Sequence, residues 1–226
     1  MKDEKIIELL KNKASLKQEI FESSKTVIAD FKSVLNELIQ KLRSDFADYD
    51  KRIIIKAEEK GEYAANFTVG SDTLVFFMHT NVFKLPDNHP QWQMSYLKDN
   101  PDNGYCSIIH IYNFLSDSFR YNRENDLGYL LARVFVNKEG HFFVEGQERL
   151  GIDYRDFMHD VMNREKIEDI FVKCIEYAID FDLYSPPYQA VETASVFQLK
   201  EVNQIMKLKT GKRLGFKFQY EQDKIT

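Results

Sequence analysis

The chain has 226 residues, of which 43% are hydrophobic and 30% are charged, and its formal net charge is −5. This balance is typical of a globular protein with one large domain and argues against a disordered chain. The negative charge makes nucleic-acid binding unlikely as the main role, because such proteins gain affinity by neutralising phosphates. Uncharged segments fall short of the roughly 18 residues that a membrane span requires, so we expect no membrane association.

The two cysteines, Cys106 and Cys174, lie in apolar surroundings without a CxxC spacing. This context predicts buried free thiols, with a single disulfide as the alternative. The first residues lack the apolar core of a signal peptide. We therefore expect a soluble protein of the reducing cytoplasm.

Residues 3–48 contain neither proline nor glycine, and their apolar residues follow a heptad period. With Ile7 taken as position a, nine of the twelve a and d positions are apolar, which predicts a long amphipathic helix. The nine are Ile7, Leu10, Ala14, Phe21, Ile28, Phe31, Leu35, Leu38 and Leu42. The stripe is broad enough to pack on the protein's own sheet, and the alternative is that it also forms a homodimer.

Two forms of this helix fit the pattern. A continuous helix of about 45 residues would be nearly 70 Å long, which exceeds a globule of this size and would favour a second chain. Alternatively, Ser15 caps a new helix, with Gln18 at the capping-box spacing. We expect the second form, a short helix followed by a long one over 15–46.

The middle of the chain changes to a period of two, which predicts β-strands. Strands over 53–58, 63–69 and 73–79 are separated by short turns, as in an antiparallel meander. Further strands are expected over 105–115, 127–136 and 141–145. The apolar runs 73–78, 108–114 and 129–136 predict central strands covered on both faces. We expect the N-terminal helix on one face and the C-terminal helices on the other.

Helical periodicity returns over 154–183 and ends at Pro186 and Pro187. A second helix is expected over 192–209 and a last strand over 214–220. The predicted fold class is α+β, with an N-terminal long helix, an antiparallel meander sheet of about six strands, and C-terminal helices packed on the sheet. We expect a helical segment over 1–50 and an α+β domain over 51–226 that form one structural unit.

The loop over 86–104 is unusually long for a compact domain, and such loops are often functional. It holds the only tryptophan, Trp92. We expect Trp92, Met94 or Tyr96 to pack the loop on the body as an ordered flap. The alternative is that the loop contacts a ligand or partner, for which Trp92, Tyr96 and His89 are the candidate residues.

Metal chemistry has weak support. His79, His110 and His141 lie in or beside expected strands, and zinc would need them to converge. None has a short-range ligand spacing, so we assign no metal site and no cofactor.

A nuclease-like pair, Asp126 and Glu145, is also weak, because Gln147 stands where a lysine is expected. A turn at 137–140 would put Glu145 opposite Ala132, six residues or about 20 Å from Asp126. Two carboxylates sharing a metal must be much closer. We expect Glu145 to pair with Arg133 instead.

The stretch "GIDYRDFMHDVMN", residues 151–163, would place Asp156 and Asp160 on one face if it were helical. Such clusters can perform acid–base chemistry, although acids in a first turn more often cap the helix. Nucleophile elbows, zincin motifs and phosphate-binding loops are absent from the sequence.

A basic segment covers 200–217, with Lys207, Lys209, Lys212 and Arg213 as candidates for contact with an anion. The leading hypothesis is a non-catalytic module that binds an unidentified protein or small-molecule partner and forms a homodimer through its N-terminal helices. One alternative is a hydrolase, with or without a metal, built from dispersed residues such as His110, Asp156 and Asp160. The other is nucleic-acid contact through 200–217.

Overall fold

The N-terminal helix runs without interruption from residue 2 to residue 46. The computed structural model describes residues 2–182, 184–185 and 187–197. In it, α1 (Lys2–Leu9) continues through a π-helical turn, η1 (Leu10–Ala14), into α2 (Ser15–Phe46). The predicted start of the long helix at residue 15 is confirmed, but the expected break before it is wrong.

Ser15 has helical dihedral angles, and its hydroxyl donates to the carbonyl of Leu10 at 3.2 Å instead of capping a new helix. A π turn adds a residue to a helix without ending it, so α1 and α2 form one continuous helix. The long, continuous form considered above is therefore the observed one.

Six strands form one antiparallel meander in chain order, and this confirms the predicted α+β class. They are β1 (Ile55–Glu59), β2 (Ala64–Val69), β3 (Asp72–Met78), β5 (Tyr105–Leu115), β6 (Tyr129–Val136) and β7 (Phe142–Gly146). A seventh, β4 (Phe83–Lys84), pairs with the start of β5. Short turns join β1 to β2, β2 to β3 and β6 to β7, whereas the connection from β3 to β5 contains the loop 86–104 and that from β5 to β6 contains residues 116–128.

The register of β6 and β7 differs by one pair from the prediction. Asn137 and His141 close the turn, because the Asn137 amide donates to the His141 carbonyl at 3.0 Å. Val136 then faces Phe142, and Glu145 faces Arg133 instead of Ala132. The predicted pairing of Glu145 with Arg133 is confirmed as an ion pair.

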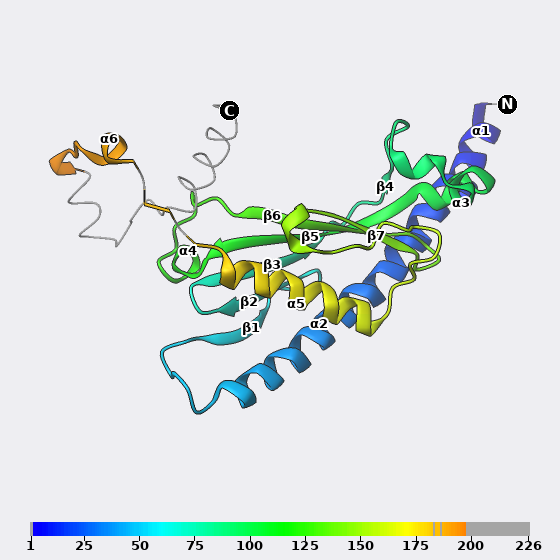
Figure 1. The fold of residues 1–226 in the computed structure, drawn as a ribbon. Helices are drawn as coiled ribbons and strands as arrows, with labels where there is room; N and C mark the ends of the chain where they lie inside the picture. The colour runs from blue at the N-terminus through cyan, green and yellow to red at the C-terminus, as the bar shows by residue number, and fades with distance from the viewer. Residues whose placement is uncertain (1, 183, 186, 198–226) are drawn as a thin grey trace.

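Both long helices lie on the same face of the sheet, so the expectation of one helix on each face is wrong (Figure 1). The second helix is α5 (Arg164–Asp180), whose N-cap Asn163 accepts from the Lys166 amide at 2.9 Å. The rings of Phe31 in α2 and Phe76 in β3 pack edge-on against Phe171 in α5, at 5.4 and 4.6 Å between centroids. This aromatic trio joins the two helices and the sheet in one core.

Residues 152–163 are not helical, although helical periodicity was expected from residue 154. The Asp156 carboxylate accepts from the amides of Met158 and His159, which forms a turn. On either side of this turn, the amides of Phe142 and Val144 donate to the carbonyls of Asp160 and Tyr154. The segment thus occupies the outer edge of β7 and satisfies its backbone groups.

The opposite face of the sheet carries a second, smaller core. The flap, residues 86–104, consists of η2 (Pro90–Gln93), α3 (Ser95–Asp99) and η3 (Pro101–Gly104). Leu97 of α3 is fully buried between the flap and the sheet. The flap covers only the end of the sheet where β5 begins. The remaining elements are η4 (Glu148–Leu150), α4 (Ser116–Arg120) after β5, and α6 (Tyr188–Val191). The expected strand over 214–220 and most of the helix over 192–209 lie outside the described residues.

Replacing Phe171 by alanine removes the ring shared by both helices and the sheet. We expect it to lower the free energy of unfolding by about 3–5 kcal/mol, as for other buried phenylalanines. Phe119→Ala, at an exposed ring, is the matched control and should cost less than about 1 kcal/mol. Urea denaturation followed by circular dichroism measures both, and equal losses would contradict this assignment of the core.

Both cysteines are buried free thiols, as predicted. Burial raises the pKa of Cys174 to about 12 and raises that of Cys106 as well. Because the thiolate is the reactive form, we expect no reaction of the native protein with a disulfide reagent at pH 8 and reaction of both thiols in denaturant. Rapid labelling of either thiol in the native protein would show that the surrounding core opens readily.

Candidate functional site

Trp92 is used within the flap itself. Its indole nitrogen donates to the Pro86 carbonyl at 2.8 Å, and Lys84 lies 5.4 Å from the ring centroid. The ring covers Gly104 so closely that a Cβ on that glycine would lie 2.5 Å from the ring edge. Trp92 therefore joins the two ends of the flap.

Tyr96 connects the flap to the turn between β6 and β7. Its hydroxyl donates to Glu139 at 2.6 Å and accepts from the side-chain amide of Asn137 at 2.8 Å. Burial, followed by the hydrogen bond to Glu139, raises the pKa of the Tyr96 hydroxyl. Asn137 is completely buried, and its side-chain oxygen Oδ1 accepts hydrogen bonds from the backbone amides of Glu139 and His141.

His89 connects the flap to β7. Its Nδ1 accepts from the Gln91 amide at 3.3 Å, so Nε2 carries the proton and donates to Glu145 at 3.0 Å. Glu145 also pairs with Arg133. A hollow of about 570 Å³ lies beside His89 and is also lined by Gln91, whose side-chain nitrogen donates to the Arg155 carbonyl. The three candidate residues of the flap thus all have intramolecular partners.

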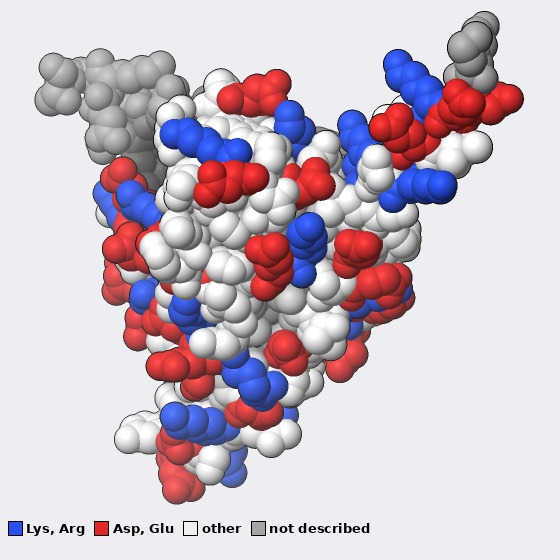
Figure 2. All heavy atoms as spheres, turned by 90° about the vertical axis from the view of Figure 1, so that its right-hand side faces the viewer, with Lys and Arg blue, Asp and Glu red and all other residues white. Residues whose placement is uncertain are grey.

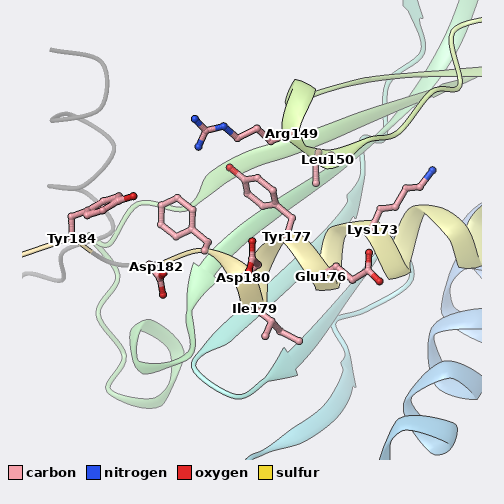
Figure 3. Close-up of a pocket in the computed structure, with 10 residues that line it drawn as sticks. Arg149, Leu150, Lys173, Glu176, Tyr177, Ile179, Asp180, Asp182 and Tyr184 are labelled. Atoms are coloured by element: carbon pink, nitrogen blue, oxygen red, sulfur yellow. The ribbon is translucent and has the colours of Figure 1, made fainter. Parts of the chain in front are cut away.

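Another hollow, of about 760 Å³, lies at the end of α5. Figure 3 shows Tyr177 and Asp180 directed toward the side where Arg149 lies, whereas Ile179 points away. Its lining contains both basic residues, Arg149 and Lys173, and acidic residues, Glu176, Asp180 and Asp182. The hollow therefore has no charge of one sign that would favour one class of ligand.

A further candidate surface is the open face, which we define as the sheet face opposite α2 and α5 and outside the flap. Strand register arranges its side chains in three cross-strand rows. The rows are Lys56–Thr68–Thr73–Phe114, Glu58–Asn66–Val75–Tyr112–Leu130 and Ala64–Phe77–His110–Arg133. Polar and charged residues occupy the β1–β2 side, and rings occupy the β3–β5 side.

The rings form a continuous series across the open face. Neighbouring centroids lie 5.4–6.5 Å apart from Phe77 through His110, Tyr112 and Phe114 to Phe119 of α4. Phe77 and Phe119 are 39% and 47% exposed. Burial, then the charge of Arg133, lowers the pKa of His110, so this ring is neutral near pH 7.

A hollow of about 840 Å³ adjoins the rings on the β1–β2 side. Its base contains a chain of hydroxyls, in which Thr68, Thr73 and Ser116 are linked at 3.1 Å each. Four cationic side chains and two carboxylates line it, which leaves an excess of positive charge. These charged residues are Arg52, Lys56, Lys60, Arg120, Glu58 and Asp117.

The residues considered for catalysis are not shown to form one cluster. His110 is on the open face, whereas Asp156 and Asp160 share a turn in which the Asp160 amide donates to the Asp156 carbonyl at 2.8 Å. The two carboxylates pair with His159 and Lys166. Asp126 accepts from the Ser118 hydroxyl and pairs with Arg123, far along the chain from Glu145. Within the part of the chain that the structure describes, no group of three His, Cys, Asp or Glu side chains is placed to hold a metal.

Sequence reasoning placed Asn66 and Thr68 in the expected strand over 63–69 but gave neither a functional role. Nor did it identify Tyr112, Phe114 and Arg120. Only the pairing register brings β1, β2, β3 and β5 together, and register cannot be deduced from alternation within single strands. Lys207, Lys209, Lys212 and Arg213 lie outside the described residues.

Comparisons with known proteins give no family for the chain: no family model, curated protein or solved structure matches it. Across the described residues, none of the helices combines the length and hydropathy needed to cross a bilayer. Function must therefore be argued from the site itself.

The contact between Trp92 and Gly104 can be tested by a double-mutant cycle. Gly104→Ala should cost about 1–3 kcal/mol of unfolding free energy, because the new methyl group overlaps the ring. In a Trp92→Ala background the same substitution should cost much less, because the ring is gone. Chemical denaturation of the four proteins measures the coupling, and additive effects would show that the ring does not cover Gly104.

Proposed function

We propose that this chain is a non-catalytic binding module that works as a homodimer formed through its N-terminal helix. The observation that carries the proposal is the arm, residues 2–14, which leaves the body of the protein (Figure 2). Every residue from Asp3 to Ser15 is exposed, and Leu16 is the first buried side chain.

The arm is apolar as well as exposed. Ile6, Ile7, Leu9 and Leu10 are each 49–58% exposed. A helical segment of this length gains little stability in water by itself, and large apolar side chains clustered on it indicate a contact surface. A second copy of the chain fits this surface because heptad spacing suits helix pairing.

Charge favours an antiparallel pair. The first part of the arm carries Asp3, Glu4 and Glu8 beside Lys2 and Lys5, and the later part carries only Lys11 and Lys13, so the first part is slightly acidic and the later part is basic. When two arms lie antiparallel, the acids of one approach the lysines of the other. Four apolar side chains bury less than the roughly 1,200 Å² of a stable interface, so we expect the contact to continue along the first turns of α2.

The binding role is supported by what the arrangement provides. Of the residues of the hydrolase alternative, Asp156 and Asp160 share a turn beside β7 and pair with His159 and Lys166, whereas His110 lies on the open face, so that alternative gains no support. The segment of the nucleic-acid alternative lies outside the described residues, and that alternative stays a prediction. Two buried free thiols suit a reducing compartment, and we propose a cytoplasmic location.

The dimer is tested by replacing Ile7 and Leu10 together by glutamate. We expect light scattering after size exclusion to give a dimer for the unchanged chain and a monomer for this variant, because four buried carboxylates would face apolar side chains. Leu127→Glu, at a residue that is 60% exposed elsewhere, is the matched control and should remain dimeric. A monomeric unchanged chain at about 100 μM would overturn the proposal.

A further inference from the structure

We propose that the open face binds a small organic anion with a flat apolar body. The apolar body lies on Tyr112, Phe114 and Phe119, and the anionic group enters the hollow beside β1 and β2. The inference rests on the proposed binding function, for which it names the ligand class, and it does not depend on the dimer.

Asn66 is the first reason. Its side chain lines the hollow, it is only 7% exposed, and within the described residues nothing bonds to its side-chain amide. The polar atoms of this side chain still reach the hollow, because they are not among the buried nitrogen and oxygen atoms that lack a partner. An anionic oxygen in the hollow would therefore accept a hydrogen bond from this amide.

The charge of the hollow is the second reason. Lys56 and Lys60 share one carboxylate, Glu58, at 2.5 and 2.8 Å, so one positive charge is left over. The hydrogen bonds from Lys56 and Lys60 lower the pKa of Glu58 to about 2, so Glu58 is ionised at neutral pH. On the opposite side, Arg120 lies over Tyr121 and has no carboxylate partner among the described residues. The hollow therefore attracts an anion from two sides.

The rings are the third reason, and they define the body of the ligand. In an antiparallel sheet, an uncovered face normally carries polar residues. Here Val75, Tyr112 and Leu130 continue directly from Asn66 in one cross-strand row. Aromatic side chains on a sheet provide faces for stacking a planar group. The open face thus has a cationic part and an aromatic part side by side. This arrangement suits a molecule that carries a negative charge at one end and a planar apolar group at the other.

Titration calorimetry with 2-naphthoate tests the site, with 2-naphthol as the neutral analogue and acetate as the anion without rings. We expect saturable binding of 2-naphthoate and at least about tenfold weaker binding of the other two, because each lacks one half of the interaction. Amide resonances should shift at Asn66, including its side chain, and at Tyr112. Equal binding of 2-naphthol, or shifts confined to the flap, would overturn the proposal.

Two variants separate the parts of the site. Arg120→Glu should weaken 2-naphthoate binding about fivefold or more. Arg149→Glu is an equal change of charge at the other hollow, which lies at the end of α5, and it should change binding less than about twofold. Asn66→Leu should also weaken binding but leave stability unchanged or raised, because no bond is lost in the free protein. A clear loss of stability in Asn66→Leu would contradict the argument.

The dimer and the ligand site fail independently. The Ile7→Glu, Leu10→Glu variant should bind 2-naphthoate as the unchanged chain does. Absence of binding by a dimeric protein at about millimolar 2-naphthoate would overturn the ligand site and leave the dimer standing. Binding by a monomeric unchanged chain would do the reverse.

Discussion

The arrangement of this protein depends on the packing of two helices against each other on one face of its sheet. Phe171 contacts both Phe31 and Phe76, so α2, α5 and β3 share one interior. Arg164 at the start of α5 also pairs with Glu37 of α2 across the surface of the helix contact, where an exposed ion pair adds little stability. Because both helices use the same face, the other face must be covered by different means or remain accessible.

The flap covers only part of that other face, and it does so with polar connections as well as apolar ones. Tyr96 and His89 each donate a hydrogen bond to a carboxylate of the β6–β7 hairpin, Tyr96 to Glu139 and His89 to Glu145. Hydrogen bonds to a carboxylate are stronger than those between neutral groups, so these two help to hold the flap in place. The flap is therefore held over β5–β7, and the β1–β3 side stays open.

Much of the fold could be predicted from the sequence because its local signals were strong. The absence of glycine and proline before residue 48, and the exact alternation around Phe67, defined the helix and the early strands. The packing of α5 on the same face as α2 could not be predicted. Apolar runs such as 108–114 indicate that both faces of a strand are covered, but not which element covers each face. Here the flap, and not a helix, supplies the second cover at Ile108.

The candidate site was harder to predict, and the reason is physical. Lys56, Glu58 and Lys60 lie on an edge strand, where charged residues prevent pairing with other chains, so their presence has a structural explanation. Phe114 likewise packs on Phe119. Asn66 is different, because neither edge protection nor packing explains an amide that lines the hollow without a bond to another described residue. Asn66 is in register with Tyr112 through Val75, so it lies between the charged edge strand and the ring cluster. It thereby connects the two parts of the surface that we propose to bind the ligand.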